Sequence, residues 1–564
     1  MTGAHVSFEI QVLSDKHWVV TQFATDEAAA KAFADNLLQK GNHAAVRVVR
    51  DYLRGDGLHA ETVIQEKTAT VKAAADLSLS PITEAPPCAA LADFYEGPAR
   101  LVMGRLLRKY WDEMMVSPSE MLHSAPEMKR FGDKGTLLFS AIDRVSSLQA
   151  AALDEESKAR RDVLTKAWDE GLARARAFAA TKPKVAATMA EILKAVEKGG
   201  DEHPYLCRSL MALRLLEVRN WVGKLDVLLA WAEEEAARPV TALIDGFVAD
   251  IVLSAQLIQD LLGYQANLGA ALVQLADLAE GKAQPAKFAP ETFTRLNALF
   301  GTGALPQAAG VLMARVTREL GGANPLSRNE PKQEFEVCHK VMHRLVHHRG
   351  VVGGGAAAEA ILHRVSRIHA HLGNVTAAQA LDLTLSALAD TVHRVHYLLA
   401  LLASPLGRGG MADMVSDALI KRIREAETID AWVPARLPPP ERMAAMAAAN
   451  RAILANAELE PELKADLAGR IDEALARYLV EDGVIERIDK PEDPLALRAI
   501  RLIKFCGSGV LIDGKSLNLA RARVIEHLRQ PNFEEKFLSS VPEPGKAEQH
   551  LREFHRLLGQ TGFR

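Results

Sequence analysis

The first 68 residues alternate between apolar and polar positions. Val6, Phe8, Ile10 and Val12 are separated by Ser7, Glu9 and Gln11, which is the period-two pattern of a strand with one buried face. Further apolar runs predict three more strands. A helix is predicted in the segment that Thr25 can cap and Gly41 can end. The strands cover residues 18–23, 45–52 and 61–66, and the helix covers 26–40. We therefore predict a small α+β domain of β-β-α-β-β order at residues 1–68.

The pattern changes beyond residue 93, where apolar residues recur every three or four positions. This spacing is typical of helices that bury one face against their neighbours. No repeat of 30 to 50 residues has a consistent register, which argues against a regular solenoid. The predicted fold class is therefore mainly α: an irregular multi-helix array preceded by the small N-terminal α+β domain.

Proline-containing segments suggest the domain boundaries. Pro81, Pro86 and Pro87 lie among alanine, serine and threonine in a predicted linker over residues 69–92. A second break is predicted at residues 434–440, where Pro438, Pro439 and Pro440 interrupt the helical pattern. The remaining predicted parts are a helical domain at 93–330, a histidine-rich central helical segment at 331–433 and a C-terminal helical domain at 441–564.

The central segment is the strongest anomaly in composition. Nine of the 18 histidines lie between His339 and His396. The pattern predicts three helices here, over residues 334–348, 356–372 and 376–402, joined by a glycine-rich loop and by Gly373 and Asn374.

Each of these three helices carries carboxylates and histidines at helical spacing. Glu336 and His339 have the Glu-x-x-His spacing of carboxylate-bridged metal bundles. The complete sets are Glu336 with His339, His343 and His347, Glu359 with His363 and His371, and Asp390 with His393. From these sets the candidate ligands of a metal ion or a haem are Glu336, His339, His343, His363 and His393. The same periodicity places most of these histidines opposite the apolar side of their helix, so an alternative is that they are solvated or lie at an interface.

Two glycine-containing segments are candidates for binding phosphate. Gly353, Gly354 and Gly355 precede a predicted helix, whose first amides attract anions. A preceding strand is missing, however, so an inter-helix turn is the favoured interpretation. Residues 509–516 match the phosphate-loop pattern and include Lys515. Their bulky residues and the helix expected before them instead favour a turn at Asp513 and Gly514.

Charge and cysteine content narrow the function classes. The 564 residues include 68 basic and 72 acidic ones, a net charge of −4, which gives no strong signal for a nucleic-acid partner. Four separated cysteines lack the spacing of a zinc site or a disulfide framework, and the first residues do not resemble a secretory signal. Charged residues interrupt the most apolar helices, so no membrane span is predicted. We expect a cytoplasmic protein.

No local catalytic motif accompanies these features. The sequence therefore predicts a non-catalytic interaction or regulatory protein that presents helical surfaces to protein partners. The free edges of the N-terminal sheet suit pairing with a second copy or another chain, and the alternative is a self-contained fold with blunted edges. One alternative is a metal- or haem-binding helical protein that uses the histidine-rich region at 334–403. A second alternative is a nucleotide-binding protein that uses the loop at 509–516.

Overall fold

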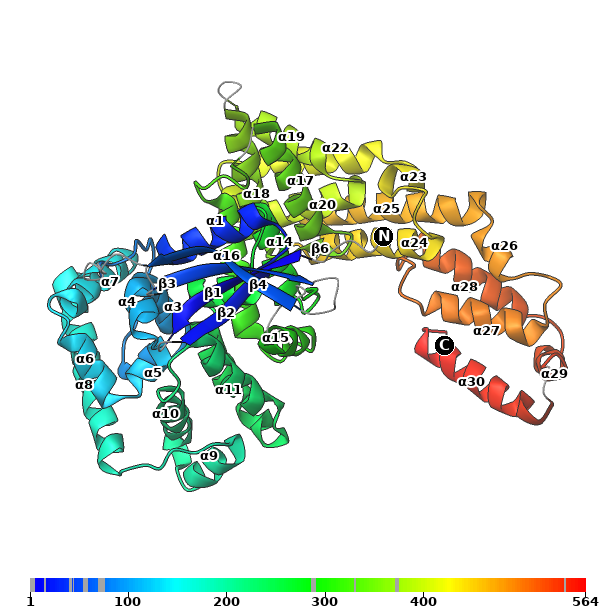
Figure 1. The fold of residues 1–564 in the computed structure, drawn as a ribbon. Helices are drawn as coiled ribbons and strands as arrows, with labels where there is room; N and C mark the ends of the chain where they lie inside the picture. Colours follow the sequence, from blue (N-terminus) through cyan, green and yellow to red (C-terminus); the bar gives the residue numbers. More distant parts are fainter. Residues whose placement is uncertain are drawn as a thin grey trace. The chain divides into compact units, whose positions relative to one another are not determined.

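The fold was analysed in a computed structural model of the chain (Figure 1). It describes residues 6–14, 17–39, 43, 45–53, 59–68, 77–285, 291–328, 331–370, 375–541 and 544–563. His371, Gly373, Asn374 and part of the predicted linker lie outside the described residues. Within them the prediction of a mainly helical array after a small N-terminal sheet is confirmed.

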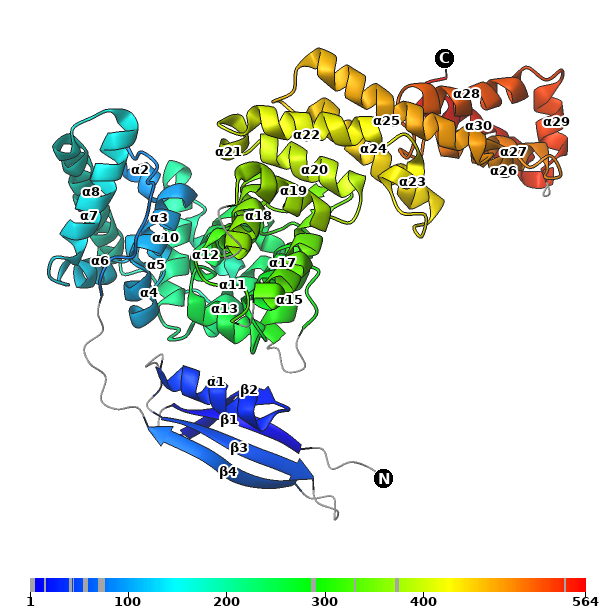
Figure 2. The same cartoon turned by 90° about the horizontal axis from the view of Figure 1, so that it is seen from above.

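The N-terminal part is a four-stranded antiparallel sheet with one helix on one face (Figure 2). Strand order is β2-β1-β3-β4, and Ile10 pairs with Val48 and Val12 with Val46 in the centre. Phe8, Ile10 and Val12 are buried under the helix, as their alternation predicts. The elements are β1 (Val6–Ser14), β2 (His17–Ala24), α1 (Glu27–Gln39), β3 (Ala45–Leu53) and β4 (His59–Thr68).

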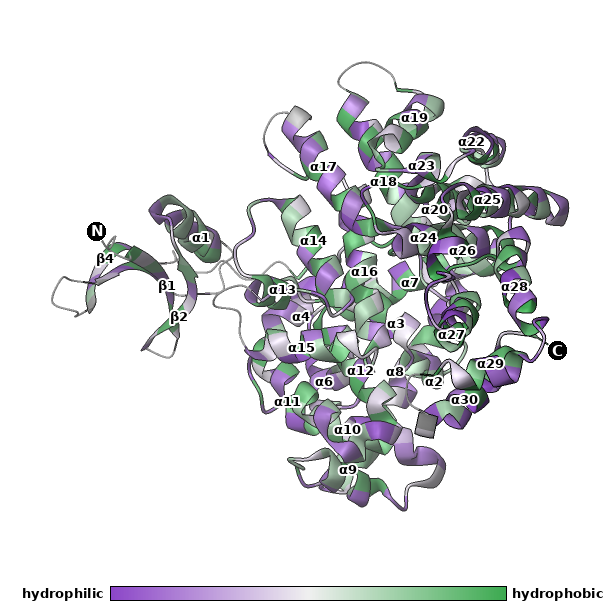
Figure 3. Ribbon diagram, turned by 90° about the vertical axis from the view of Figure 1, so that its right-hand side faces the viewer, coloured by the Kyte–Doolittle hydropathy of each residue, from purple (hydrophilic) through white to green (hydrophobic). Residues whose placement is uncertain are grey.

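The chain forms two compact units, residues 1–266 with 274–313 and residues 267–273 with 314–564. Most helices carry both strongly hydrophilic and strongly hydrophobic residues, as expected for helices with one buried side (Figure 3). The helices that begin before residue 314 are α2 (Leu91–Phe94), α3 (Gly97–Leu106), α4 (Arg108–Met114), α5 (Pro118–Leu122), α6 (Ala125–Gly132), α7 (Leu137–Leu153), α8 (Ser157–Ala180), α9 (Met189–Val196), α10 (His203–Leu215), α11 (Trp221–Glu233), α12 (Thr241–Ile251), α13 (Ala255–Leu262), α14 (Leu268–Ala279), α15 (Glu291–Gly301) and α16 (Pro306–Gly321).

The later elements start in the histidine-rich region and continue to the C-terminal part. They are α17 (Pro331–Leu345), β5 (Val346–His347), β6 (Gly350–Val351), α18 (Gly354–His369), α19 (Ala377–Ala387), α20 (Thr391–Leu402), α21 (Pro405–Arg408), α22 (Ala412–Glu425), α23 (Ile429–Trp432), α24 (Pro439–Ala455), α25 (Pro461–Glu481), α26 (Val484–Ile488), α27 (Leu495–Cys506), α28 (Lys515–Leu528), α29 (Phe533–Ser539) and α30 (Ala547–Gln560). The predicted proline break separates α23 from α24, and α24 packs on α20 and α25 of the same unit.

A buried arginine links three helices of the first unit. Arg100 on α3 donates to Ser119 Oγ at 2.7 Å, to the carbonyl of Gly246 at 2.8 Å and to Asp250 Oδ1 at 2.7 Å. The other carboxylate oxygen of Asp250 accepts from the Ser119 amide at 2.9 Å and hydroxyl at 2.6 Å. A Cβ on Gly246 would lie only 2.8 Å from the Arg100 guanidinium. Since both charges are paired, α3, α5 and α12 are joined around a buried ion pair without an isolated buried charge.

A second buried arginine performs the equivalent task in the second unit. Arg364 on α18 is 1% exposed and donates to the carbonyls of Leu320 at 2.7 Å, Asn324 at 2.8 Å and Gly322 at 2.9 Å. Its guanidinium also lies 3.3 Å from Glu334 Oε1. The carbonyls at and after the end of α16 have no partner within that helix, so one cation satisfies them and fixes α18 against this end.

The predicted helices of the histidine-rich region need two corrections. The first predicted helix ends at Leu345 rather than residue 348, and the chain continues into the short pair β5 and β6. The single helix predicted over 376–402 is in fact two helices, α19 and α20, with a break at residues 388–390. The break occurs because Asp390 is extended, with φ −153° and ψ 178°, and caps the start of α20 with its side chain.

His123 predicts how the first unit responds to acid. The ring is 3% exposed, Nδ1 lies 2.7 Å from the Ser119 carbonyl, and Nε2 has no hydrogen-bond partner among the described residues. Burial lowers the pKa of His123 from 6.5 to about 3. Between these values the unfolded chain holds more protons, so the free energy of unfolding falls with falling pH, by up to about 1.4 kcal/mol per pH unit from this residue.

We expect His123→Phe to flatten this dependence between about pH 4 and 6.5. Urea unfolding followed by tryptophan fluorescence measures it, because five of the six tryptophans belong to the first unit. His203→Gln, at the half-exposed start of α10, is the matched control and should keep the parent's slope. Equal slopes for the parent and His123→Phe would contradict the prediction.

Candidate metal centre

The candidate site is built where the β5–β6 turn meets the start of α20. Val346 pairs with Val351 and His347 with Gly350, and this tight turn carries His348. His396, one turn into α20, is 4% exposed and lies with Nε2 3.0 Å from the His348 carbonyl. Burial lowers the pKa of His396 to about 4, so at neutral pH the ring is uncharged and donates this hydrogen bond. The turn is thereby attached to α20.

Asp390 is the centre of the site. Its Oδ1 accepts from the backbone N–H of His393 at 3.0 Å and from Nδ1 of the same residue at 2.8 Å. Its Oδ2 accepts from Nε2 of His348 at 2.8 Å. Burial alone would raise the pKa of Asp390, but the hydrogen bonds from both histidines outweigh this and hold the pKa well below its usual range. The carboxylate is therefore ionised at any physiological pH.

His348, Asp390 and His393 have the composition of a metal-binding group. One ring nitrogen of each histidine and one carboxylate oxygen all lie within 4.8 Å of one another. Among the residues that the structure describes, no other three histidine, cysteine or acidic side chains bring their ligand atoms within this distance of one another. Zinc–nitrogen bonds of about 2.1 Å place tetrahedral ligands roughly 3.4 Å apart, so small movements of these side chains suffice to surround an ion.

The site is partly open to solvent. The side chains of His348 and His393 are 27% and 13% exposed, whereas that of Asp390 is 6% exposed. The two imidazole rings lie 4.2 Å apart, centre to centre. A buried anion with two imidazoles at an accessible edge offers three ligands and leaves coordination positions for water or another group.

Two further histidines lie near this group without joining it. The rings of His339 and His343 on α17 are 4.4 Å apart, and Nε2 of His339 lies 2.7 Å from the carbonyl of Ala387 at the end of α19. Burial, and then the neighbouring His339 and His393, lower the pKa of His343. His343 is exposed, and it is close enough to His393 and Asp390 for their charges to act on its pKa.

Of the five predicted metal ligands, His393 alone belongs to the group. Glu336 is exposed on α17, and His363 on α18 is 54% exposed and lies 3.6 Å from Glu359. His339 is engaged with the α19 carbonyl. His348 is missing from the predicted set because the pattern extends a helix through it. The sequence did contain one signal: Asp390 followed by Thr391 and His393 has the form of a helix N-cap.

The predicted glycine site has a packing explanation at Gly355. A Cβ on Gly355 would lie 2.9 Å from the Ala400 carbonyl and 3.0 Å from the Ser404 amide, so glycine allows α18 to start directly against the end of α20. Gly353 has φ +83° and Gly354 φ +59°, a backbone conformation that favours glycine. Both are exposed. The structure thus explains these glycines by helix packing and turn geometry.

In the loop that matches the phosphate-loop pattern, a carboxylate occupies the place of a phosphate. Asp472 on α25 accepts from the amides of Lys515 and of Ser516, the latter at 3.0 Å, and thereby caps α28. The Lys515 ammonium group is paired with Glu473 at the surface. These are the amides and the cation that a phosphate would need. A carboxylate from a neighbouring helix satisfies them instead.

Comparison of the chain with protein-family models, with curated proteins and with solved structures finds no match. Among the described helices, none is by itself long and apolar enough to cross a membrane. One pair, residues 235–251 with α13, passes that test jointly but is bent by 93°. The function must therefore be argued from the site itself.

Replacing Asp472 tests the role of the loop at 509–516. We expect Asp472→Ala to expose the first turn of α28 and to speed amide hydrogen exchange there by roughly 5- to 30-fold, equivalent to a lost cap of about 1–2 kcal/mol. Lys515→Ala, which removes an exposed pair, should leave exchange unchanged. Exchange measured by mass spectrometry distinguishes the two variants. ATP binding that is lost in Lys515→Ala would contradict this assignment.

Proposed function

We propose that the protein binds a divalent transition-metal ion through His348, Asp390 and His393. The observation that carries the proposal is the convergence of two imidazole nitrogens and a buried, ionised carboxylate within 4.8 Å. Two nitrogen ligands and one oxygen ligand favour Zn²⁺, Fe²⁺, Co²⁺ or Ni²⁺ over Mg²⁺ and Ca²⁺, which prefer oxygen. The 4.2 Å separation of the two rings leaves no room for a porphyrin between them, so the proposal concerns a bare ion rather than a haem.

Metal binding would act on the local conformation. His348 lies on the β5–β6 turn, whereas Asp390 and His393 form the first turn of α20. An ion held by all three would replace the hydrogen bonds that now connect these segments with stronger and more directional bonds. We therefore propose a regulatory role, in which metal occupancy sets the position of this turn within a non-catalytic helical protein that binds protein partners.

A cytoplasmic location is part of the same proposal. The four cysteines, Cys88, Cys207, Cys338 and Cys506, are all buried and none forms a disulfide. Free thiols throughout the chain are typical of a reducing compartment.

Cobalt titration tests the metal site. The EDTA-treated chain should bind one Co²⁺ per molecule and develop d–d absorption, and Zn²⁺ should displace it. Asp390→Asn is the sharpest variant because asparagine still caps α20 but supplies no carboxylate. We expect Asp390→Asn and His348→Ala each to weaken binding by more than about 100-fold. Circular dichroism checks that the helices remain.

His363→Ala is the matched control, because it removes an exposed histidine of the same unit and should leave the titration unchanged. This control separates the proposed site from the weak metal binding of any histidine-rich surface. Equal affinity in the parent and in the His348→Ala, Asp390→Asn double variant would rule out the site.

The N-terminal sheet supports a second proposal, self-association. Within the described residues β2 pairs with β1 alone and β4 with β3 alone, so both are edge strands. Val19 and Val20 on β2 are 48% and 38% exposed, and Val63 on β4 is 47% exposed. Edge strands usually carry charged residues that prevent pairing with other chains. β4 has Glu61, Glu66 and Lys67, whereas β2 has no acidic residue, lysine or arginine, so β2 is the edge that favours such pairing more.

Light scattering after size-exclusion chromatography measures this self-association. The parent chain should show a mass above 61.3 kDa that rises with concentration. Val20→Lys with Val63→Lys should shift it to a monomer, while Val185→Lys, an exposed valine outside the sheet, should not. A parent chain that stays monomeric at all concentrations would exclude self-association.

A further inference from the structure

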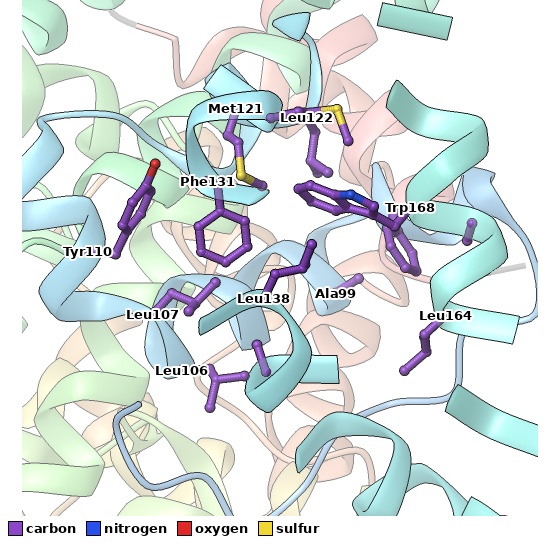
Figure 4. Close-up of a cluster of buried hydrophobic side chains, with 14 of the residues drawn as sticks. Ala99, Leu106, Leu107, Tyr110, Met121, Leu122, Phe131, Leu138, Leu164 and Trp168 are labelled. Carbon is purple, nitrogen blue, oxygen red and sulfur yellow. The ribbon is translucent and has the colours of Figure 1, made fainter. Parts of the chain in front are cut away.

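A small apolar cavity lies in the first unit. Its volume is about 80 Å³, and helices α2, α3 and α5–α8 surround it together with the extended segment 82–88. Figure 4 shows several of the lining side chains pointing toward one another from different helices. They include Ala99, Met121, Phe131, Leu138, Leu164 and Trp168. Apolar side chains dominate the walls of the cavity, so its composition is not that of a site for buried water.

The amide of the polar side chain in the wall, Gln149, is bonded within the protein through both its nitrogen and its oxygen. Gln149 donates from Nε2 to the carbonyl of Pro86 at 2.6 Å, and its Oε1 accepts from Arg160 at 2.9 Å. The other sulfur- or nitrogen-bearing residues of the wall are Cys88, Trp168 and two methionines. A buried water needs about two to four polar partners, so this cavity favours an apolar guest over water.

Segment 82–88 covers one side of the cavity and belongs to neither a helix nor a strand. Ala85, Pro86 and Cys88 form part of the wall. The segment is held by side chains: Arg144 donates to the carbonyl of Ile82 at 2.6 Å, Gln149 to that of Pro86, and Arg160 to that of Cys88. These bonds come from α7 and α8. These hydrogen bonds can break while both helices remain intact, so segment 82–88 can move independently of the helical core.

We propose that this cavity is a binding site for a small uncharged apolar molecule, between xenon and benzene in size, which enters when segment 82–88 moves away from α7 and α8. An apolar cavity of about 150 Å³ is known to stay dry and to bind both guests. The present cavity is about half that volume, but Met103 and Met121 line it, and methionine side chains adjust readily to the shape of a guest. The site is independent of the metal group, which lies in the other unit.

Xenon and benzene are the probes for the full-length chain. Dissolved ¹²⁹Xe should show a protein-dependent NMR shift that saturates, and benzene should compete with it. Benzoate should not compete, because its charge cannot be solvated in the cavity. Absence of a saturable xenon shift, or equal competition by benzoate, would overturn the proposal.

Two substitutions of opposite direction test the location. Ala141→Leu adds bulk to the wall and should weaken benzene binding at least tenfold, whereas Leu164→Ala enlarges the cavity and should strengthen it. Because one of the two is expected to increase binding, misfolding cannot imitate the full result. Xenon shifts that are identical in the parent and both variants would place the guest elsewhere and refute the assignment.

Arg144→Ala tests the entry route. It removes the bond to the Ile82 carbonyl but does not touch the cavity wall. Exchange of benzene, measured by NMR line broadening, should become faster while the affinity changes less than the rate. Arg161→Ala, which removes a surface pair with Asp143 on the same helices, is the matched control and should exchange at the parent's rate. Exchange in Arg144→Ala that equals the control's would refute entry past this segment.

Discussion

The structure depends on one constraint, the need to satisfy helix ends inside a helical array. The first amides and last carbonyls of each helix lack partners within that helix, and burial makes them costly to leave unpaired. This chain satisfies several of them with charged side chains from other helices. Asp245 binds the amides of Gln307 and Ala308 at the start of α16, Asp472 caps α28, and Arg364 collects the carbonyls at the end of α16. Each contact fulfils a local need and at the same time fixes two helices against each other.

The candidate metal centre arises from the same constraint. Asp390 caps α20 with one carboxylate oxygen, and the second oxygen is left to accept from His348. The helix start and the hydrogen bonds from both histidines favour an ionised carboxylate here, against the effect of burial. The helical geometry of α20 brings His393 to the same oxygen that caps the helix. In the proposed metal site, the carboxylate that caps α20 also serves as a metal ligand, because one turn and two imidazoles lie beside it. The opposite outcome is seen at α28, where the cap by Asp472 fills a position that the sequence pattern assigns to phosphate.

The two units offer different chemistry. The first unit has an apolar interior with a small cavity beside an extended segment, and its buried charges include closed ion pairs such as Arg100 with Asp250 and Lys224 with Glu120. These pairs have no ligand capacity left, because each partner is already neutralised and hydrogen-bonded. In the second unit the carboxylate of Asp390 is paired with histidines. Imidazole gives up its proton far more readily than arginine or lysine, and the neutral ring is a common metal ligand. This difference in partners, rather than the number of buried charges, is the reason why we propose the metal site in the second unit.

The sequence by itself determined the fold class and the N-terminal elements. Alternation at Val6 to Val12 and helical spacing further along the chain are local properties, and burial of one face follows from them directly. It also pointed to the histidine-rich region and to the pairing of Asp390 with His393. It did not reveal the break between α19 and α20, because alanine, leucine and threonine continue the helical pattern through it. Only tertiary structure decided that His348 joins Asp390, since a turn 42 positions earlier must be brought against α20 by packing that no local pattern encodes.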